Sequence, residues 1–156
     1  MRYTDNAINI IAAKSFKNIG RAWINKNLKG NESPDTIVSL INKNSKQDDE
    51  VTFDDFEFSK TKIINQLDKL EEFCDGIVAI GDKNFPKYRG NVKESEQPIF
   101  LFYKGNLDLL DTDNCNITVI GLLNPDEAIE QREQKIVAEI VKYDITIVSG
   151  LAFGCD

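Results

Sequence analysis

The spacing of apolar residues changes near Gly76, and this change restricts the possible fold more than any other feature of the chain. Before Gly76, apolar side chains recur at the three- and four-residue intervals of amphipathic helices. After it, short apolar runs at 77–80, 98–103, 117–120 and 145–148 lie between turn residues, as strands do. The sequence therefore predicts an α/β protein, with a small helical domain over residues 1–75 and the start of a parallel sheet within residues 76–156.

Four helices are expected in the first half, and local signals mark where they begin. Asp5 precedes the first helical apolar pattern, and Arg21 follows Gly20. Ser33 stands before Pro34 and Asp35, and Thr52 stands three residues before Asp55, as capping side chains do. The polar segment 42–50 predicts a loop.

A parallel pair of strands is expected near the end of the chain. The runs 117–120 and 145–148 are separated by an amphipathic helix over 125–143, with its start signal at Asn124. A strand, a crossover helix and an apolar strand form one βαβ unit, whose two strands lie side by side and parallel.

Glycine-rich loops follow both of these strands. Gly121 ends the first, and the loop Ser149–Gly154, which includes Gly150, follows the second. Ligands of parallel sheets bind beyond the carboxyl ends of the strands, where small residues and backbone N–H groups favour an anion such as phosphate. Simple close packing of backbone is the other explanation of these glycines, and the sequence leaves both open.

The connection between the first two expected helices is a second candidate phosphate site. Asn18-Ile19-Gly20-Arg21-Ala22 is similar to the hairpin of a helix-hairpin-helix element, in which glycine lets phosphate approach the backbone. Lys17, Arg21 and Lys26 would add positive charge. Any tight connection between helices also favours glycine, so a purely structural connector is the alternative.

Charge is unevenly distributed along a chain whose net charge is −7. Residues 1–30 carry six basic side chains against Asp5 alone, a balance of +5, whereas residues 101–156 have a balance of −6. Because phosphate contacts need Lys and Arg, any nucleic acid is expected to meet the N-terminal end. Ordinary solvated surface is the alternative explanation of both balances.

Composition also excludes several kinds of chemistry. The chain has no histidine, so a histidine-based triad, metal site or general base is excluded within these 156 residues. The three cysteines, at positions 74, 115 and 155, have no metal-ligand spacing and predict free thiols in a reducing compartment. No apolar run approaches the roughly 18–20 residues of a membrane span, and no signal peptide is recognisable. We expect a cytoplasmic protein with no metal, no cofactor and no membrane contact.

Four segments, in this order and spacing, together resemble the DNA-processing protein A (DprA/Smf) family. They are Asp82-Lys83-Asn84-Phe85-Pro86-Lys87-Tyr88, Gln97-Pro98-Ile99-Phe100-Leu101-Phe102-Tyr103-Lys104-Gly105-Asn106-Leu107, Ile120-Gly121, and Ser149-Gly150-Leu151-Ala152-Phe153-Gly154-Cys155-Asp156. The resemblance covers residues 76–156. The helical first half is similar to the family's small N-terminal domain in character only.

The resemblance implies a Rossmann-like domain that binds single-stranded DNA and loads a RecA-type recombinase on it during natural transformation, in competent cells. It implies a homodimer when full length and no catalytic residue, because this role makes and breaks no bond. Family members continue beyond the position of Asp156, so the Rossmann-like domain is expected to be incomplete here. Strand 145–149 would then be an uncovered sheet edge, and we expect a lowered melting temperature and aggregation or pairing of copies.

Departures from the family pattern remove positive charge. The family usually has Ser-Arg after the first glycine and favours Arg inside the last motif, where this chain has Leu122, Leu123 and Phe153. Weak binding of single-stranded DNA that depends on residues 14–29 is therefore expected. A Rossmann-like sensor or hydrolase of a nucleotide-derived ligand is the alternative function, and a helical interaction module with a degenerate attached domain is a third.

Overall fold

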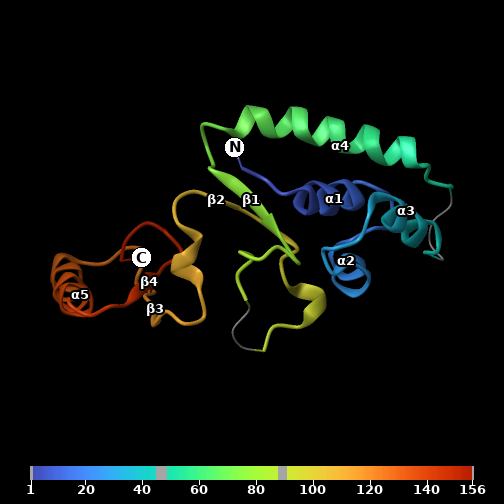
Figure 1. Cartoon of the computed structure of the whole chain (residues 1–156). Coiled ribbons are helices and arrows are strands. Elements are labelled where there is room, and N and C mark those ends of the chain that lie inside the picture. Colours follow the sequence, from blue (N-terminus) through green and yellow to red (C-terminus); the bar gives the residue numbers. More distant parts are fainter. Residues whose placement is uncertain (1, 45–48, 88–90, 156) are drawn as a thin grey trace. The chain divides into compact units, whose positions relative to one another are not determined.

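The computed structural model describes residues 2–44, 49–87 and 91–155 (Figure 1). The chain forms two compact units, Met1–Leu107 and Asp108–Asp156, and each is described by itself below. Part of the expected loop at 42–50, together with Tyr88 and Asp156 of the motifs above, lies outside the described residues. The observed fold class is mixed α/β, with a helical region followed by a partial sheet, which confirms the expectation.

Four α-helices form most of the first unit: α1 (Asp5–Lys14), α2 (Arg21–Asn27), α3 (Pro34–Asn42) and α4 (Phe53–Leu67), the last continued by the short helix η1 (Asp68–Leu70). Ser33 and Thr52 cap α3 and α4 as predicted, and Thr52 forms a reciprocal capping box with Asp55. The expected cap at Asp5 is wrong by one residue. Thr4 accepts the cap bond from the Ala7 N–H, and the Asp5 carboxylate lies in the first turn, at the positive end of the helix dipole.

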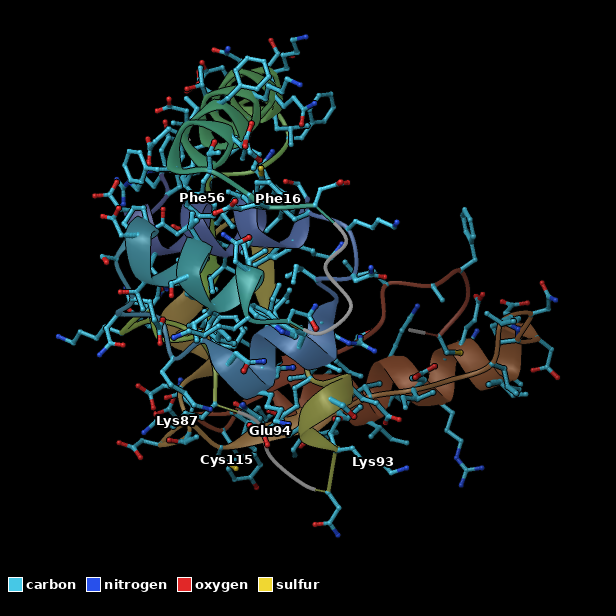
Figure 2. The ribbon with its side chains drawn as sticks, turned by 90° about the vertical axis from the view of Figure 1, so that its right-hand side faces the viewer. Phe16, Phe56, Lys87, Lys93, Glu94 and Cys115 are labelled. Carbon is cyan, nitrogen blue, oxygen red and sulfur yellow. The ribbon has the colours of Figure 1, made fainter. Side chains whose placement is uncertain are left out.

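The core of the first unit is built around α1, and α4 packs along one side of it (Figure 1). Phe16 and Phe56 stack with ring centroids 6.1 Å apart and planes only 9° from parallel, and so join the end of α1 to α4 (Figure 2). The largest fully buried side chains are aliphatic residues and Phe56, as an apolar core requires: Ile8, Ile10, Ile24, Leu28, Ile37, Ile41, Phe56 and Ile77.

A small antiparallel sheet of two strands, β1 (Gly76–Ala79) and β2 (Phe100–Tyr103), packs against the helices. Gly76 lies opposite Tyr103, and Ala79 lies opposite Phe100. Arg2 forms a parallel bridge to Gly76, so the chain start extends the sheet by one residue pair. Because this sheet packs on α1, the first compact unit extends to Leu107. The domain division at residues 75 and 76 rests on the change of period and stays a prediction.

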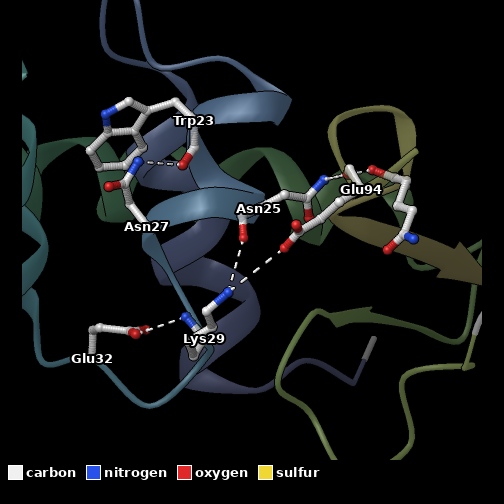
Figure 3. A network of polar contacts seen from close by, with 7 residues as sticks. Trp23, Asn25, Asn27, Lys29, Glu32 and Glu94 are labelled. Atoms are coloured by element: carbon white, nitrogen blue, oxygen red, sulfur yellow. Dashed lines mark hydrogen bonds and ion pairs between the residues drawn. The ribbon is translucent and has the colours of Figure 1, made fainter.

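A polar clamp ties the β1–β2 connection to α2 (Figure 3). The Asn25 side chain, only 6% exposed, donates to the Glu94 carbonyl at 2.7 Å and to the Gln97 carbonyl at 3.0 Å. Lys29 donates to the Asn25 carbonyl and lies 3.8 Å from a Glu94 carboxylate oxygen. These contacts position η2 (Glu94–Glu96) and the residues that lead into β2.

Two glycines meet where β1 ends. Gly30 and Gly81 both have positive φ, and a Cβ on Gly30 would lie 2.5 Å from the Gly81 Cα. Asp82, in the turn after β1, accepts bonds from the Ala79 N–H and from the Thr4 and Asn6 side chains. The end of the first strand is therefore held by contacts with residues more than seventy-five positions earlier in the chain.

The second unit contains β3 (Asn116–Thr118), α5 (Glu127–Ile140) and β4 (Thr146–Val148), with the short helix η3 (Leu107–Leu110) at its start. The two strands pair in parallel, with Ile117 opposite Ile147, which confirms the predicted strand–helix–strand unit. The expected helix start at Asn124 is wrong by two residues, because Asp126 accepts the cap bond from the Ile129 N–H. None of the described residues from 108 to 155 is fully buried.

The described residues also bear on the expectations about cysteines, membrane spans and metal sites. Cys74 is buried, Cys115 is exposed and Cys155 is half-buried, and all three are free thiols. Among the described helices, none has both the length and the apolar character that a membrane crossing requires. No group of three or more acidic or cysteine side chains within residues 2–44, 49–87 and 91–155 is placed to hold a metal ion.

Candidate functional site

The connection between α1 and α2 holds the first group of predicted site residues. Ile19 is buried and anchors the connection in the core, whereas Gly20 is exposed. The left-handed residue of this turn is Asn18, with φ of +62°, and Gly20 has the extended backbone of an N-cap. A Cβ on Gly20 would meet nothing within 4 Å, so the turn itself does not need glycine there. The open space leaves room for a ligand to approach the backbone.

The predicted cations of this group differ in their surroundings. Lys17 and Lys26 are exposed, and Lys26 lies in the last turn of α2. The Arg21 Nε donates to the Ser95 carbonyl at 3.2 Å, so its guanidinium is partly engaged with η2. Because α2 has only seven residues, we attribute any attraction for phosphate mainly to these side chains and little to the helix dipole.

The second group of predicted residues lies at the carboxyl ends of β3 and β4, where the two loops touch. The Cys155 N–H donates to the Leu122 carbonyl at 3.0 Å. A Cβ on Gly121 would collide with the Cβ of Cys155, and one on Gly154 would collide with the Leu122 carbonyl. Gly154 also has a φ of +98°. Close packing of the two loops therefore accounts for both glycines, and the structure brings Gly121 and Gly154 together as the sequence predicts.

Ser149 opens the loop after β4 and shapes its first turn. Its hydroxyl accepts from the Leu151 N–H at 3.3 Å, and Leu151 has a φ of +55°, which is uncommon for a side chain of this size. Gly150 lies inside this turn. Leu151 and Phe153 are 90% and 94% exposed, so the loop projects two apolar side chains.

A cavity of about 280 Å³ lies beside the Gly121 loop and one face of α5. Most of its lining is apolar, and Arg132 and Glu133 also line it. The Cys155 thiol hydrogen-bonds to the Glu133 carboxylate, and this bond, with burial and the charge of that carboxylate, raises the pKa of the thiol. The thiol therefore stays protonated at neutral pH, which does not favour a nucleophilic role.

Arg132 is the residue near this loop that the sequence analysis did not single out. It lies three residues after Ile129 and four before Ile136, on the helix face that lines the cavity with Gly121 and Leu122. This helical spacing is the feature of the sequence that could have indicated that Arg132 lies on the same face as Ile129 and Ile136. Among the described residues, its guanidinium is the one cation of a cavity lining that also holds the Glu133 carboxylate, whereas Leu122, Leu123 and Phe153 carry no charge.

The two groups of predicted residues belong to different compact units. Lys17, Gly20, Arg21 and Lys26 lie in the first, and Gly121, Ser149, Gly150 and Gly154 lie in the second. Whether either group contacts DNA or phosphate stays a prediction.

Comparison with known proteins identifies one related family. The model of the family described as DNA recombination-mediator protein A matches residues 76–156, just over half of the chain. This range includes β1, β2 and the whole strand–helix–strand unit with both of its glycine-rich loops. No curated protein and no solved structure matches the chain significantly.

Proposed function

Because this chain belongs to the DNA recombination-mediator protein A family, we propose that it binds single-stranded DNA and loads a RecA-type recombinase on it. The process served would be recombination of DNA taken up in natural transformation. The role is one of binding, with no bond made or broken and no cofactor. The same proposal places the full-length protein in the cytoplasm, as a homodimer.

The observation that carries the proposal is the juxtaposition of two loops within the matched range. The Gly121 loop and the loop from Ser149 to Gly154 lie against each other at the carboxyl ends of β3 and β4. Ligands of parallel sheets bind at this edge. The exposed backbone of these loops, with Arg132 beside them, is where we propose that the second unit meets the DNA strand.

Electrostatics sets the strength of the proposed binding. Each cation that neutralises a phosphate of a single strand contributes about 0.7 to the slope of log affinity against log salt. The strand-end loops carry few cations, whereas Lys17, Arg21 and Lys26 lie in the segment whose balance is positive. We therefore expect weak, salt-sensitive binding that depends more on the first unit than on the second.

A titration of labelled oligonucleotide at low and moderate salt tests this proposal. The variant Lys17→Ala, Arg21→Ala, Lys26→Ala should bind more weakly and show a salt slope lower by about 2 if all three residues contact phosphate. The control variant Lys69→Ala, Lys87→Ala, Lys104→Ala changes net charge equally at other exposed positions and should keep the wild-type slope. Tight binding that survives the first variant would place the contact elsewhere.

A second candidate function is recognition or hydrolysis of a nucleotide-derived ligand. The observation that favours it is the pair of cavities, of about 280 and 510 Å³, that adjoin Cys155 and the two loops. If wild-type protein binds no oligonucleotide even at low salt, mononucleotides should be tested for an increase in melting temperature. An increase would support this alternative, and no increase would count against it.

A further inference from the structure

A groove of about 450 Å³ runs along the first unit, between the end of α1 and α4. The two helices contact each other along this groove, because the hydroxyls of Ser15 and Ser59, which both line it, lie 2.8 Å apart. Phe16, which also lines it, stacks on Phe56 (Figure 2). These fixed contacts make the groove a preformed feature of the unit. The residues that line it differ from the predicted site residues of the strand-end loops and of the α1–α2 connection.

One wall of the groove carries an exposed aromatic ring beside a cation. Phe58 is 62% exposed on α4, although burial of its ring would be favourable. Lys62, one turn later, places its Nζ 4.3 Å from the centroid of this ring, as in a cation–π pair. Because 62% of Phe58 is exposed, part of its ring remains accessible to another planar group. Proteins that hold single-stranded nucleic acid combine these two elements, an aromatic platform and a nearby cation.

Polar groups in the groove match a nucleobase better than a phosphate. Gln66 has an exposed amide that can pair with a base edge, and it lies one turn beyond Lys62. Asp55 also lines the groove. The side-chain and backbone hydrogen bonds from Thr52 lower the pKa of the Asp55 carboxyl, so it is ionised at neutral pH. A carboxylate repels phosphate but accepts hydrogen bonds from base amino and imino groups.

Two lysines flank the groove residues of the α1 side in the chain. Lys14 ends α1 and Lys17 follows shortly after, one on each side of the groove residues Ser15 and Phe16 in the chain. Both are exposed. They belong to the N-terminal thirty residues, whose balance is +5 in a chain of net charge −7. The α4 wall carries three acidic side chains, Asp54, Asp55 and Glu57, against Lys60 and Lys62, so the positive charge that attracts a polyanion lies on the α1 side of the groove.

We propose that the α1–α4 groove binds a nucleobase of single-stranded nucleic acid, which stacks on Phe58 while its backbone follows Lys14, Lys17 and Lys62. The inference rests on the proposed binding of single-stranded DNA and assigns a base-contacting site to the helical unit. Base stacking tolerates sequence, since every base has a π-face, so the contact suits a mediator that acts on any strand.

The test uses the whole chain and a labelled oligothymidine, with an abasic strand of equal length as a second probe. Phe58→Ala should weaken oligothymidine binding by roughly 5- to 150-fold, the range for loss of one stacked base, and leave binding of the abasic strand unchanged. Phe73→Ala is the matched control, because Phe73 is 71% exposed and does not line the groove. It should bind both probes as the wild type does.

Photocrosslinking gives a readout that does not depend on affinity. An oligonucleotide with iodouracil should crosslink to the α4 segment that contains Phe58, as mapped by mass spectrometry. If Phe58→Ala binds oligothymidine as tightly as the wild type does, and the crosslinks map outside α4, the groove site is wrong while the proposed function stands. Wild-type protein that binds no oligonucleotide would overturn both. Loss of affinity for both probes in Phe58→Ala, with unchanged circular dichroism, would overturn base stacking.

Discussion

Substitution of Gly30 by alanine tests the contact that holds the end of β1 against the α2–α3 connection. Gly30 has a φ of +91°, a backbone conformation that costs a residue with a side chain about 1–3 kcal/mol. The new Cβ would also lie 2.5 Å from both the Gly81 Cα and the Ile80 carbonyl oxygen. Both are backbone atoms, which cannot rotate away.

The magnitude follows from these two effects. Overpacking of a close contact costs about 1–3 kcal/mol, so strain and overlap together should destabilise the first unit by about 2–6 kcal/mol. Small domains have only about 5–15 kcal/mol of stability, and 1 kcal/mol shifts the melting temperature of a domain of this size by about 4–8 °C. We expect a decrease in melting temperature on the order of 10–50 °C.

Gly105 offers a matched control within the same unit. Its φ is +92°, yet a Cβ there would meet nothing within 4 Å. Gly105→Ala should therefore incur the backbone strain alone, about 1–3 kcal/mol. Urea unfolding and thermal melts followed by circular dichroism measure both variants. If Gly30→Ala is no less stable than Gly105→Ala, the close approach of Gly30 to Gly81 is wrong.

Three further predictions concern side chains of the first unit. Asn25→Ala leaves the carbonyls of Glu94 and Gln97 without their buried donor, so we expect a loss of about 1–3 kcal/mol; a loss below about 0.5 kcal/mol in urea unfolding would contradict the clamp. Burial works to raise the pKa of Glu32, but hydrogen bonds from backbone N–H groups, including those of Lys29 and Gly30, outweigh it and hold the pKa below its usual range. A depressed carboxyl pKa contributes stability above the unfolded value that is lost as pH falls through the folded one. The melting temperatures of Glu32→Gln and the wild type should therefore differ most near pH 7 and converge in acid, and a difference that grows in acid would refute this sign. Thr52→Ala removes one half of the α4 capping box and should cost about 0.5–2 kcal/mol by the same unfolding assay, whereas Thr52→Ser should retain most of the stability.

Local signals explain why much of the secondary structure can be predicted. Ser33 and Thr52 cap their helices through bonds to residues three positions away, so the pattern in the sequence is the contact itself. The misplaced starts at Asp5 and Asn124 differ from the observed caps by one and two residues, because Thr4 and Asp126 are equally suitable capping residues nearby. Competition between neighbouring caps is not resolved by spacing alone.

The candidate site was predictable in position but not in packing. Parallel pairing of β3 and β4 brings Gly121 and the loop after Ser149 to one edge, as their places in the sequence indicate. The collision that a Cβ on Gly121 would have with Cys155 depends on how two loops more than thirty residues apart meet. Arg132 enters the site for a similar reason, since the rotation of α5 decides which of its faces lines the cavity.

The sequence by itself determined the order and type of the elements, the family over residues 76–156 and the glycines at the strand ends. Tertiary structure alone decided that β1 pairs antiparallel with β2, and that Asn25 and Gly30 hold this hairpin against the helices. It also decided that Phe58 and Lys62 line a groove with the end of α1. The physical reason is the distance along the chain over which the deciding interactions act. Periodicity and caps are set by neighbours within one or two turns, whereas strand partners and groove walls depend on which distant surfaces bury each other.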